Sequence, residues 1–110
     1  MTEPALHDQQ CQPLKGAEHA LPDQEIDAFL MQLPGWKRDG EGIRKPFKFK
    51  DYHHTMAFVN AVAWIAHRQD HHPDLDVGYN RCGVFFSTHD VGGLSKNDMI
   101  CAAKVDALLG

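Results

Sequence analysis

The sequence has little cysteine, no long apolar run and no excess of positive charge, and each shortage excludes a class of protein. Its three cysteines, Cys11, Cys82 and Cys101, are widely spaced and include no Cys-x-x-Cys pair. Neither a disulfide framework nor a thiolate zinc site is indicated, so we expect three reduced thiols in a cytoplasmic protein. No apolar run approaches the roughly 20 residues that span a membrane.

The balance of charge narrows the choice of partners. The chain has 11 basic and 15 acidic residues and a formal net charge of −4 at pH 7. A protein that binds nucleic acid or an anionic membrane needs a basic face, so we expect neither partner. The first residues, Met1 to Ala5, lack the basic and apolar regions of a signal peptide.

Length and periodicity divide the chain into an arm and one domain. The 110 residues are enough for a single domain. Residues 1–20 are polar, include Pro4, Pro13 and Gly16, and show no hydrophobic period. This composition predicts a poorly ordered N-terminal arm that is dispensable for fold and activity. Residues 21–110 form the predicted domain.

Within the predicted domain, apolar residues recur with helix and strand periods in alternation. The predicted helices cover residues 22–33, 52–69 and 96–108, and the predicted strands cover residues 36–39, 43–49, 77–82 and 84–88. The last two strands are equally consistent with one bent strand that has a bulge at Gly83. The order α-β-β-α-β-β-α predicts an α+β fold, with a four-stranded antiparallel sheet and three helices on one face.

Several local signals refine this prediction. Asp51 is a suitable N-cap for the long helix, and Ser95 with Asp98 resembles a capping box for the last helix. Pro46 lies inside a predicted strand and favours an edge or a bulge there. The expected buried stripe of the long helix is formed by Met56, Val59, Ala63 and Ala66 and is widened by Phe58, Val62 and Ile65. The expected buried stripe of the last helix is formed by Ile100, Ala103, Ala107 and Leu108.

Three histidines lie at the ends of predicted elements. His71 and His72 precede Pro73, which keeps them at or just beyond the end of the long helix. His89 follows the last predicted strand, between Thr88 and Asp90. Imidazole is the only side chain whose unperturbed pKa lies near neutral pH. Loops at element ends are also where a rigid scaffold presents functional groups.

The three histidines allow three interpretations. They could be solvated surface residues, zinc ligands, or a metal-free acid–base site. Adjacent histidines such as His71 and His72 project in different directions, and the sequence has no His-Glu-x-x-His motif for zinc. We therefore expect no metal, and acid–base chemistry by the histidines is the favoured interpretation.

The spacing of these motifs resembles the pterin-4a-carbinolamine dehydratases over about residues 21–108. The residues that carry the resemblance are His71-His72-Pro73, Tyr79, Thr88-His89, Gly93-Leu94-Ser95-x-x-Asp98, Leu33-Pro34-Gly35-Trp36, Phe47-x-Phe49 and Phe58. Two positions depart from the family pattern. His67 replaces a frequent acidic residue, and Leu75 replaces a frequent tryptophan.

The resemblance implies a hydro-lyase, 4a-hydroxytetrahydrobiopterin dehydratase, that acts in tetrahydrobiopterin recycling without a cofactor. It would convert a 4a-hydroxytetrahydropterin to a quinonoid dihydropterin and water. By this analogy His71 and His89 are the acid and the base, in an order that the sequence leaves open, and His72 orients the pterin. The implied substrate-binding residues are His71, His72, Pro73, Thr88, His89, Asp90 and Val91.

The resemblance also implies partners. A homodimer or homotetramer is expected, together with an aromatic amino-acid hydroxylase of the same pathway. Two alternative functions stay open at this point. One is a protein-binding module, since members of the family also act as dimerisation cofactors of a homeodomain transcription factor. The other is a pterin-binding protein of molybdopterin metabolism.

Overall fold

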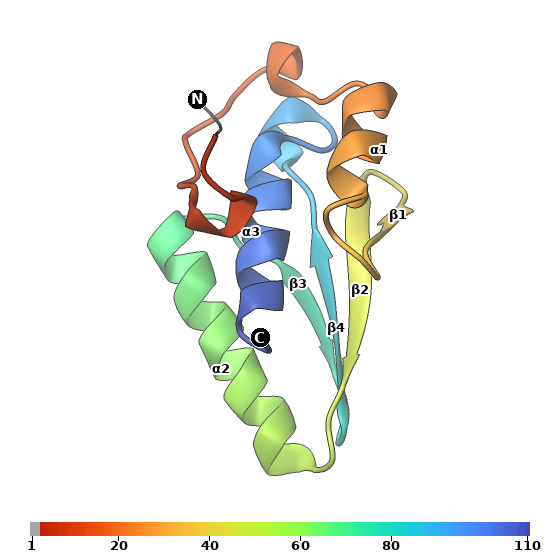
Figure 1. The fold of residues 1–110 in the computed structure, drawn as a ribbon, viewed down its shortest axis with the longest axis vertical. Helices are drawn as coiled ribbons and strands as arrows, with labels where there is room; N and C mark the ends of the chain where they lie inside the picture. The colour runs from red at the N-terminus through yellow and green to blue at the C-terminus, as the bar shows by residue number, and fades with distance from the viewer. Residues whose placement is uncertain (1–2) are drawn as a thin grey trace.

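The computed structural model describes residues 3–110 and contains a four-stranded antiparallel sheet and three α-helices (Figure 1). The elements are α1 (Asp23–Leu30), β1 (Lys37–Asp39), β2 (Gly42–Lys48), α2 (Tyr52–Gln69), β3 (Asp74–Val77), β4 (Arg81–Phe86) and α3 (Lys96–Ala107). Three 3-10 turns are η1 (Leu6–Asp8), η2 (Ala17–His19) and η3 (His89–Val91). The predicted fold class and element order are confirmed.

The sheet has the strand order β1-β2-β4-β3, and all three strand pairs are antiparallel. The helices α2 and α3 lie side by side on one face of this sheet (Figure 1). The second hairpin turns at residues 78–80, where the Gly78 N–H donates to the Arg81 carbonyl over 2.9 Å. The predicted break at Gly83 is wrong, because Gly83 lies inside β4 opposite Pro46.

Pro46 lies in β2, which has a neighbouring strand on each side in the sheet order but no partner on the β1 side at this position. The short strand β1 pairs with β2 only from Gly42 to Arg44, so it ends before Pro46 is reached. On its other side β2 continues to pair with β4 at this point. A proline that lacks an N–H group is therefore tolerated, because β1 does not extend far enough to need one.

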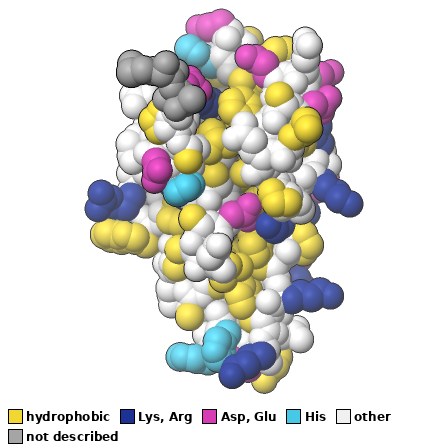
Figure 2. Space-filling view, in the orientation of Figure 1, with side chains coloured by type: hydrophobic (Ala, Val, Ile, Leu, Met, Phe, Trp, Pro, Cys, Tyr) yellow, Lys and Arg dark blue, Asp and Glu magenta, His cyan; other side chains and the backbone are white. Residues whose placement is uncertain are grey.

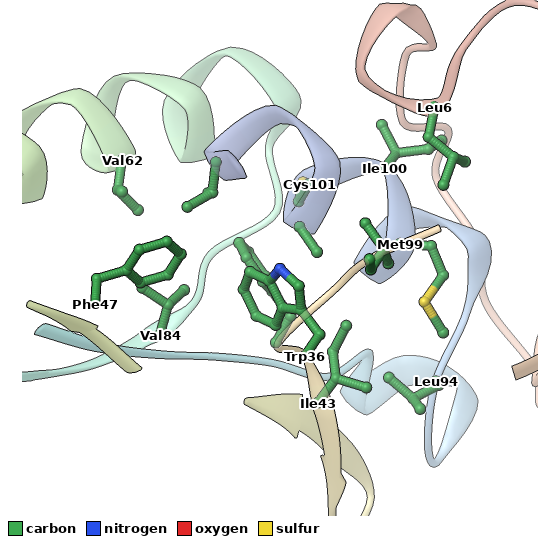
Figure 3. Packing of buried hydrophobic residues seen from close by; sticks show 14 of the residues in the cluster. Leu6, Trp36, Ile43, Phe47, Val62, Val84, Leu94, Met99, Ile100 and Cys101 are labelled. Atoms are coloured by element: carbon green, nitrogen blue, oxygen red, sulfur yellow. The ribbon is translucent and has the colours of Figure 1, made fainter. Parts of the chain in front are cut away.

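The hydrophobic core lies between the sheet and the helices (Figure 3). Trp36 is at its centre, 3% exposed, and its ring packs against Phe47 and Phe86 with centroids 6.2 and 6.0 Å away. The indole N–H donates to the Asp106 carboxylate over 3.1 Å. This contact joins the segment before β1 to the C-terminal part of α3 and gives the buried polar edge of the indole a partner.

The buried faces of the two long helices agree only in part with the predicted stripes. Asp51 caps α2 as predicted, accepting a hydrogen bond from the His54 N–H over 2.9 Å. The buried residues of α2 are Thr55, Phe58, Val62 and Ala66. Ala63, which the sequence analysis placed in the stripe, is exposed. The buried residues of α3 are Asn97, Asp98, Met99, Ile100, Cys101, Ala102 and Val105, so α3 is covered on more than one side.

The segment before α1 provides part of that cover. The composition of residues 1–20 predicts a poorly ordered arm, whereas the described residues 3–20 follow a defined path beside α3 (Figure 1). Leu6 is 8% exposed and belongs to the core. The Cys11 N–H donates to the Gln69 side chain over 2.8 Å, and the Gly16 N–H donates to the Asp90 carbonyl over 3.1 Å. The arm is thus attached to α2, η3 and α3.

The face seen in Figure 2 has no continuous patch of one charge. Acidic side chains gather toward the top of this view, and basic ones lie along its sides and lower end. Among the described residues, none of the helices is long and apolar enough to cross a membrane.

Candidate active site

The first two motif histidines lie just past the C-terminal end of α2, as predicted. The helix ends at Gln69, and Asp70 adopts the left-handed conformation with φ 50° and ψ 44°. The His71 N–H then donates to the Ala66 carbonyl over 3.2 Å. This local turn satisfies an end carbonyl of the helix and directs the chain toward β3.

His71 is paired with a buried carboxylate from another element. Its Nε2 lies 2.6 Å from Oδ1 of Asp98, in the first turn of α3. The imidazole is 12% exposed and the Asp98 side chain is 0% exposed. The other side of the ring stacks on Phe86 at the end of β4, with ring centroids 5.8 Å apart and planes 8° apart. Helix, strand and carboxylate together hold the ring in one orientation.

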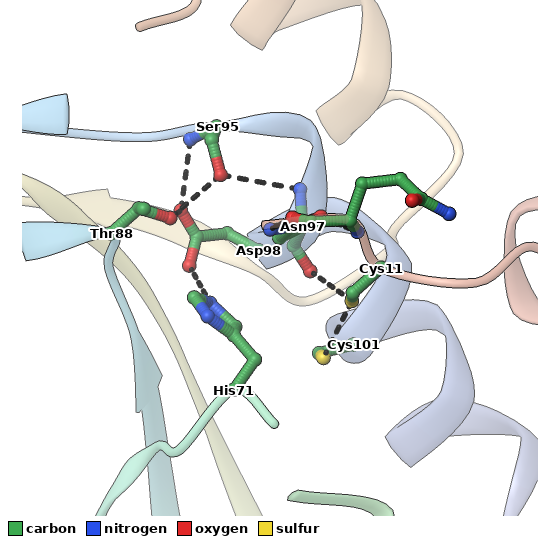
Figure 4. A network of polar contacts seen from close by, with 8 residues as sticks. Cys11, His71, Thr88, Ser95, Asn97, Asp98 and Cys101 are labelled. Carbon is green, nitrogen blue, oxygen red and sulfur yellow. Dashed lines mark hydrogen bonds and ion pairs between the residues drawn. The ribbon is translucent and has the colours of Figure 1, made fainter. Parts of the chain in front are cut away.

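The same carboxylate closes the cap of α3 (Figure 4). Its Oδ2 accepts hydrogen bonds from the Thr88 hydroxyl over 2.7 Å and from the Ser95 N–H over 2.9 Å. Because the Thr88 proton is used there, the Ser95 hydroxyl donates to Thr88 Oγ1 over 2.7 Å. The predicted capping box is confirmed, and its aspartate also contacts the histidine motif.

Two opposed effects set the charge preference of His71. Burial is the larger single effect and lowers the pKa of the imidazole, because it disfavours a charged ring. The hydrogen bond to Asp98 and the negative charge of Asp98 raise it, with smaller help from Cys11 and Asp70. The sum raises the pKa of His71 above its ordinary value of 6.5. The site therefore favours an imidazolium paired with a carboxylate.

The three motif histidines line one cavity of about 200 Å³. His71 and His72 contribute from the end of α2, and His89 contributes from η3. The remaining lining residues are Asp70, Ser87, Thr88 and Asp90. His72 and His89 are exposed. Pro73 and Val91, two residues implied by the resemblance, are not among the residues that line this cavity, and Val91 is 5% exposed in η3.

A second cavity of about 180 Å³ also borders His71, and the N-terminal arm forms part of its wall. Its lining shares Asp70, His71, Thr88 and Asp90 with the first cavity. The arm contributes Gln12, Pro13, Leu14 and Lys15. This contribution is not predicted from the sequence, because the arm has no hydrophobic period that would indicate a packed segment.

Asp98 is the other site residue whose role the sequence analysis missed. The sequence indicates Asp98 only as a capping residue and as part of the family motif. A signal was present, because aspartate replaces the more common glutamate of a capping box. The shorter side chain keeps the carboxylate close to the helix end, where it reaches Thr88 and His71.

The positions that depart from the family pattern lie outside both cavities. His67 is exposed on α2, where its ring packs against Trp64 with centroids 5.7 Å apart. Leu75 is half-buried in β3 and packs against the core. Between residues 3 and 110, no group of three or more His, Cys, Asp or Glu side chains is arranged to hold a metal ion.

Comparison with known sequences identifies the relatives of this chain. The model of the family described as pterin 4 alpha carbinolamine dehydratase matches residues 19–108. A protein of Nitrosospira multiformis is 58% identical over 103 residues, which cover 94% of this chain and 91% of that protein. One of Stenotrophomonas maltophilia is 59% identical over 100 residues, covering 89% of this chain and 86% of that protein. Both carry the provisional name pterin-4-alpha-carbinolamine dehydratase.

Two solved structures are similar in fold. A transcriptional coactivator/pterin dehydratase from Brucella melitensis has a TM-score of 0.79 and 35% identity, covering 82% of this chain and 98% of that chain. A pterin dehydratase-like protein described as a RuBisCO assembly factor in the alpha-carboxysome has a TM-score of 0.60 and 28% identity. That match covers 69% of this chain and 90% of the other.

Proposed function

The chain belongs to the pterin 4 alpha carbinolamine dehydratase family, and we propose that it dehydrates a 4a-hydroxytetrahydropterin to a quinonoid dihydropterin and water. The observation that carries this proposal is the cavity lined by three histidines, one of them paired with a buried carboxylate. Elimination of water needs an acid for the leaving hydroxyl and a base for a ring proton. Imidazole serves either purpose near neutral pH.

His71 is the proposed acid. Its Nε2 is occupied by Asp98, so Nδ1 is the nitrogen available to a substrate. The pairing with Asp98 favours the protonated ring, which carries a proton on Nδ1 that can pass to the leaving hydroxyl. After this transfer the Nε2–H still donates to Asp98, so the carboxylate stabilises the required tautomer before and after the step. Asp98 acts through His71 and is a positioning residue.

His89 is the proposed base, and His72 is the proposed substrate-orienting residue. His89 lies in η3 at the other wall of the same cavity, from which it can accept a proton from a ring nitrogen. His72 lies beside His71 and contributes an exposed imidazole to the cavity edge. Loss of water moves no electrons to or from the protein, so the proposal includes no redox cofactor, and it assigns both proton transfers to histidines.

The proposal is tested by steady-state kinetics of single variants on a 4a-hydroxytetrahydropterin. His71→Ala and His89→Ala should each lower kcat by about 10²–10⁴-fold, or about 3–5 kcal/mol, down to the floor set by the uncatalysed reaction. His72→Ala should mainly raise KM, because a positioning residue contributes to both bound states.

The matched control is His53→Ala, at an exposed position in the first turn of α2. It should leave both kinetic constants within about twofold of the wild type. If the His71/His89 double variant keeps wild-type turnover, the assignment of the active site is wrong.

The proposed partners follow from family membership. We infer a homodimer or homotetramer, to be measured by light scattering, and a metabolic link to an aromatic amino-acid hydroxylase in the cytoplasm. The names of the two structural neighbours mention a coactivator and an assembly factor, and these words describe those proteins. Activity on molybdopterin-related rings, assayed beside the carbinolamine, would favour the alternative pterin function.

A further inference from the structure

Two cysteines far apart in the sequence face each other outside the histidine cavity. The Sγ of Cys11, in the arm, lies 3.5 Å from the Sγ of Cys101, in α3 (Figure 4). The two residues are 90 positions apart. Cys82, the third cysteine, is buried in β4 opposite Phe47. All three thiols are free in the structure.

We propose that Cys11 and Cys101 are a reversible oxidation site, at which a peroxide converts the two thiols to a disulfide that fixes the arm beside His71. This proposal concerns the thiols and the arm, and it does not depend on the dehydratase activity. A disulfide bond is about 2.05 Å long, so the sulfurs must approach by about 1.5 Å. Cys11 lies in a segment without helix or strand, which can make that movement.

The surroundings make the two thiols unequal. A hydrogen bond from the Cys101 thiol stabilises the thiolate form of Cys11, and this contact is the main reason that the pKa of Cys11 is lowered. Burial opposes the effect, and the positive charges of His71 and Lys104 support it. The same contact and burial raise the pKa of Cys101. Cys11 therefore supplies the thiolate, which is the nucleophilic form.

Access to oxidant follows the same order. Cys11 is partly exposed, whereas Cys101 is 0% exposed. The Cys11 thiolate attacks one oxygen of hydrogen peroxide, giving a sulfenic acid and hydroxide, and the hydroxide combines with the proton released when the Cys11 thiol ionised to give water. Cys101 then attacks the sulfenic sulfur and loses its proton, and the hydroxyl group leaves as water. In total, two thiols and one peroxide give one disulfide and two waters.

The consequence concerns the second cavity. Cys11 directly precedes the residues 12–15 that form the wall beside His71. The arm is held there by hydrogen bonds, including one of 2.6 Å from the Asn97 side chain to the Gln12 carbonyl. A covalent link at Cys11 converts this reversible attachment into a fixed wall.

The test uses the full chain treated with hydrogen peroxide and digested with trypsin without reduction. Cleavage at Lys15, Arg81, Lys96 and Lys104 places the three cysteines on separate peptides, 1–15, 82–96 and 97–104. We expect peptides 1–15 and 97–104 to be linked, with the mass of two hydrogen atoms lost and restored by dithiothreitol. The Tm of the oxidised protein should rise by at least about 5 °C, because the link closes a very long loop.

Two variants keep the proposal falsifiable. Cys11→Ser, in the partly exposed segment, should fold and show neither the linked peptides nor the rise in Tm. Cys82→Ala should show both, as the wild type does. A product in which Cys11 is oxidised while Cys101 keeps a free thiol would overturn the proposal. So would a link that involves Cys82 or joins two chains.

Discussion

Asp98 is the residue on which most of the site depends. One carboxylate oxygen pairs with His71, and the other accepts from Thr88 and from the backbone of Ser95. The N-terminus of α3 adds a favourable field for the negative charge. A buried charge is costly unless it is paired and hydrogen-bonded, and here all of its partners are supplied by two nearby segments. The helix cap and the acid–base residue are therefore energetically coupled.

The first prediction removes the charge of Asp98 and keeps its shape. In Asp98→Asn the pKa of His71 should fall from above 6.5 to below it, because burial of the ring then acts without a carboxylate to oppose it. The measurement is an NMR titration of the imidazole protons. Asp90→Asn, an exposed acid at the same cavities, is the control and should move this pKa far less. An unchanged pKa in Asp98→Asn would mean that the pair does not stabilise the charge.

The second prediction concerns the dependence of stability on pH. Since folding raises the pKa of His71 above 6.5, the native state binds more protons than the unfolded state around and above that pH. The contribution of His71 to the free energy of unfolding is complete below about pH 6.5 and is lost as pH rises through the folded pKa. Urea denaturation at several pH values should show this fall in the wild type.

The variant that tests this effect is His71→Gln, in which the free energy of unfolding should fall less as the pH rises. His72→Gln, at the exposed neighbouring position, should keep it. A fall of the same size in His71→Gln would assign the effect to other groups.

At the scale of the elements, the helices differ from prediction in the width of the buried face of α2 and in the extent of burial of α3. The buried face of α2 runs through Phe58, Val62 and Ala66 as predicted, whereas Ala63 is exposed. On α3, Cys101 and Ala102 are both 0% exposed although they are adjacent. A helix that packs against one partner buries one stripe. The sheet, α2 and the arm all contact α3, so its burial extends around the helix.

The third prediction compares two neighbouring positions of α2. Val62→Ala should lower the free energy of unfolding by roughly 2 kcal/mol, because it leaves a cavity at a position that is 0% exposed. Ala63→Gln should change it by no more than about 0.5 kcal/mol, since Ala63 is exposed. Chemical denaturation measures both values. The reverse order of effects would mean that Ala63, and not Val62, faces the core.

At the scale of the whole molecule, the arm joins the core to the site. Leu6 fills a place in the core, and Lys104 of α3 donates to the His7 carbonyl over 2.9 Å. Further along, residues 12–15 form a wall of the cavity beside His71. The arm thus contributes to stability at one end and to the shape of the site at the other. From this packing we expect the arm to be needed for stability and substrate binding, whereas its composition alone predicts a dispensable arm.

The fourth prediction is that deletion of residues 1–16 weakens both properties. The Tm should fall by more than about 5 °C, on the order of 1 kcal/mol for a domain of this size. The KM for the pterin should rise more than kcat falls, because the wall is lost while the histidines remain. Leu6→Ala should reproduce only the loss of Tm, and Pro4→Ala, at an exposed position, should change neither. A truncated protein with unchanged Tm and KM would support the arm as first expected.

Much of the fold could be predicted because short-range sequence patterns determine its helices and strands. Periods of apolar residues, the N-cap at Asp51 and the capping box at Ser95 involve neighbours within a few positions of the chain. Pro73 keeps His71 and His72 at the end of α2 for a steric reason that is also local. The strand bounds near Gly83 are predicted wrongly, because the turn at residues 78–80 contains neither Asn-Gly nor Asp-Gly and gives a weak signal in the sequence.

The sequence by itself therefore determined the order of the elements, the fold class and the presence of three histidines at element ends. Only the tertiary structure decided that Asp98 pairs with His71, 27 positions away, and that Cys11 meets Cys101, 90 positions away. It also decided that the arm covers α3. The physical reason is that such contacts depend on the free energy of packing the whole chain, whereas periodicity and capping signals reflect interactions within one or two turns.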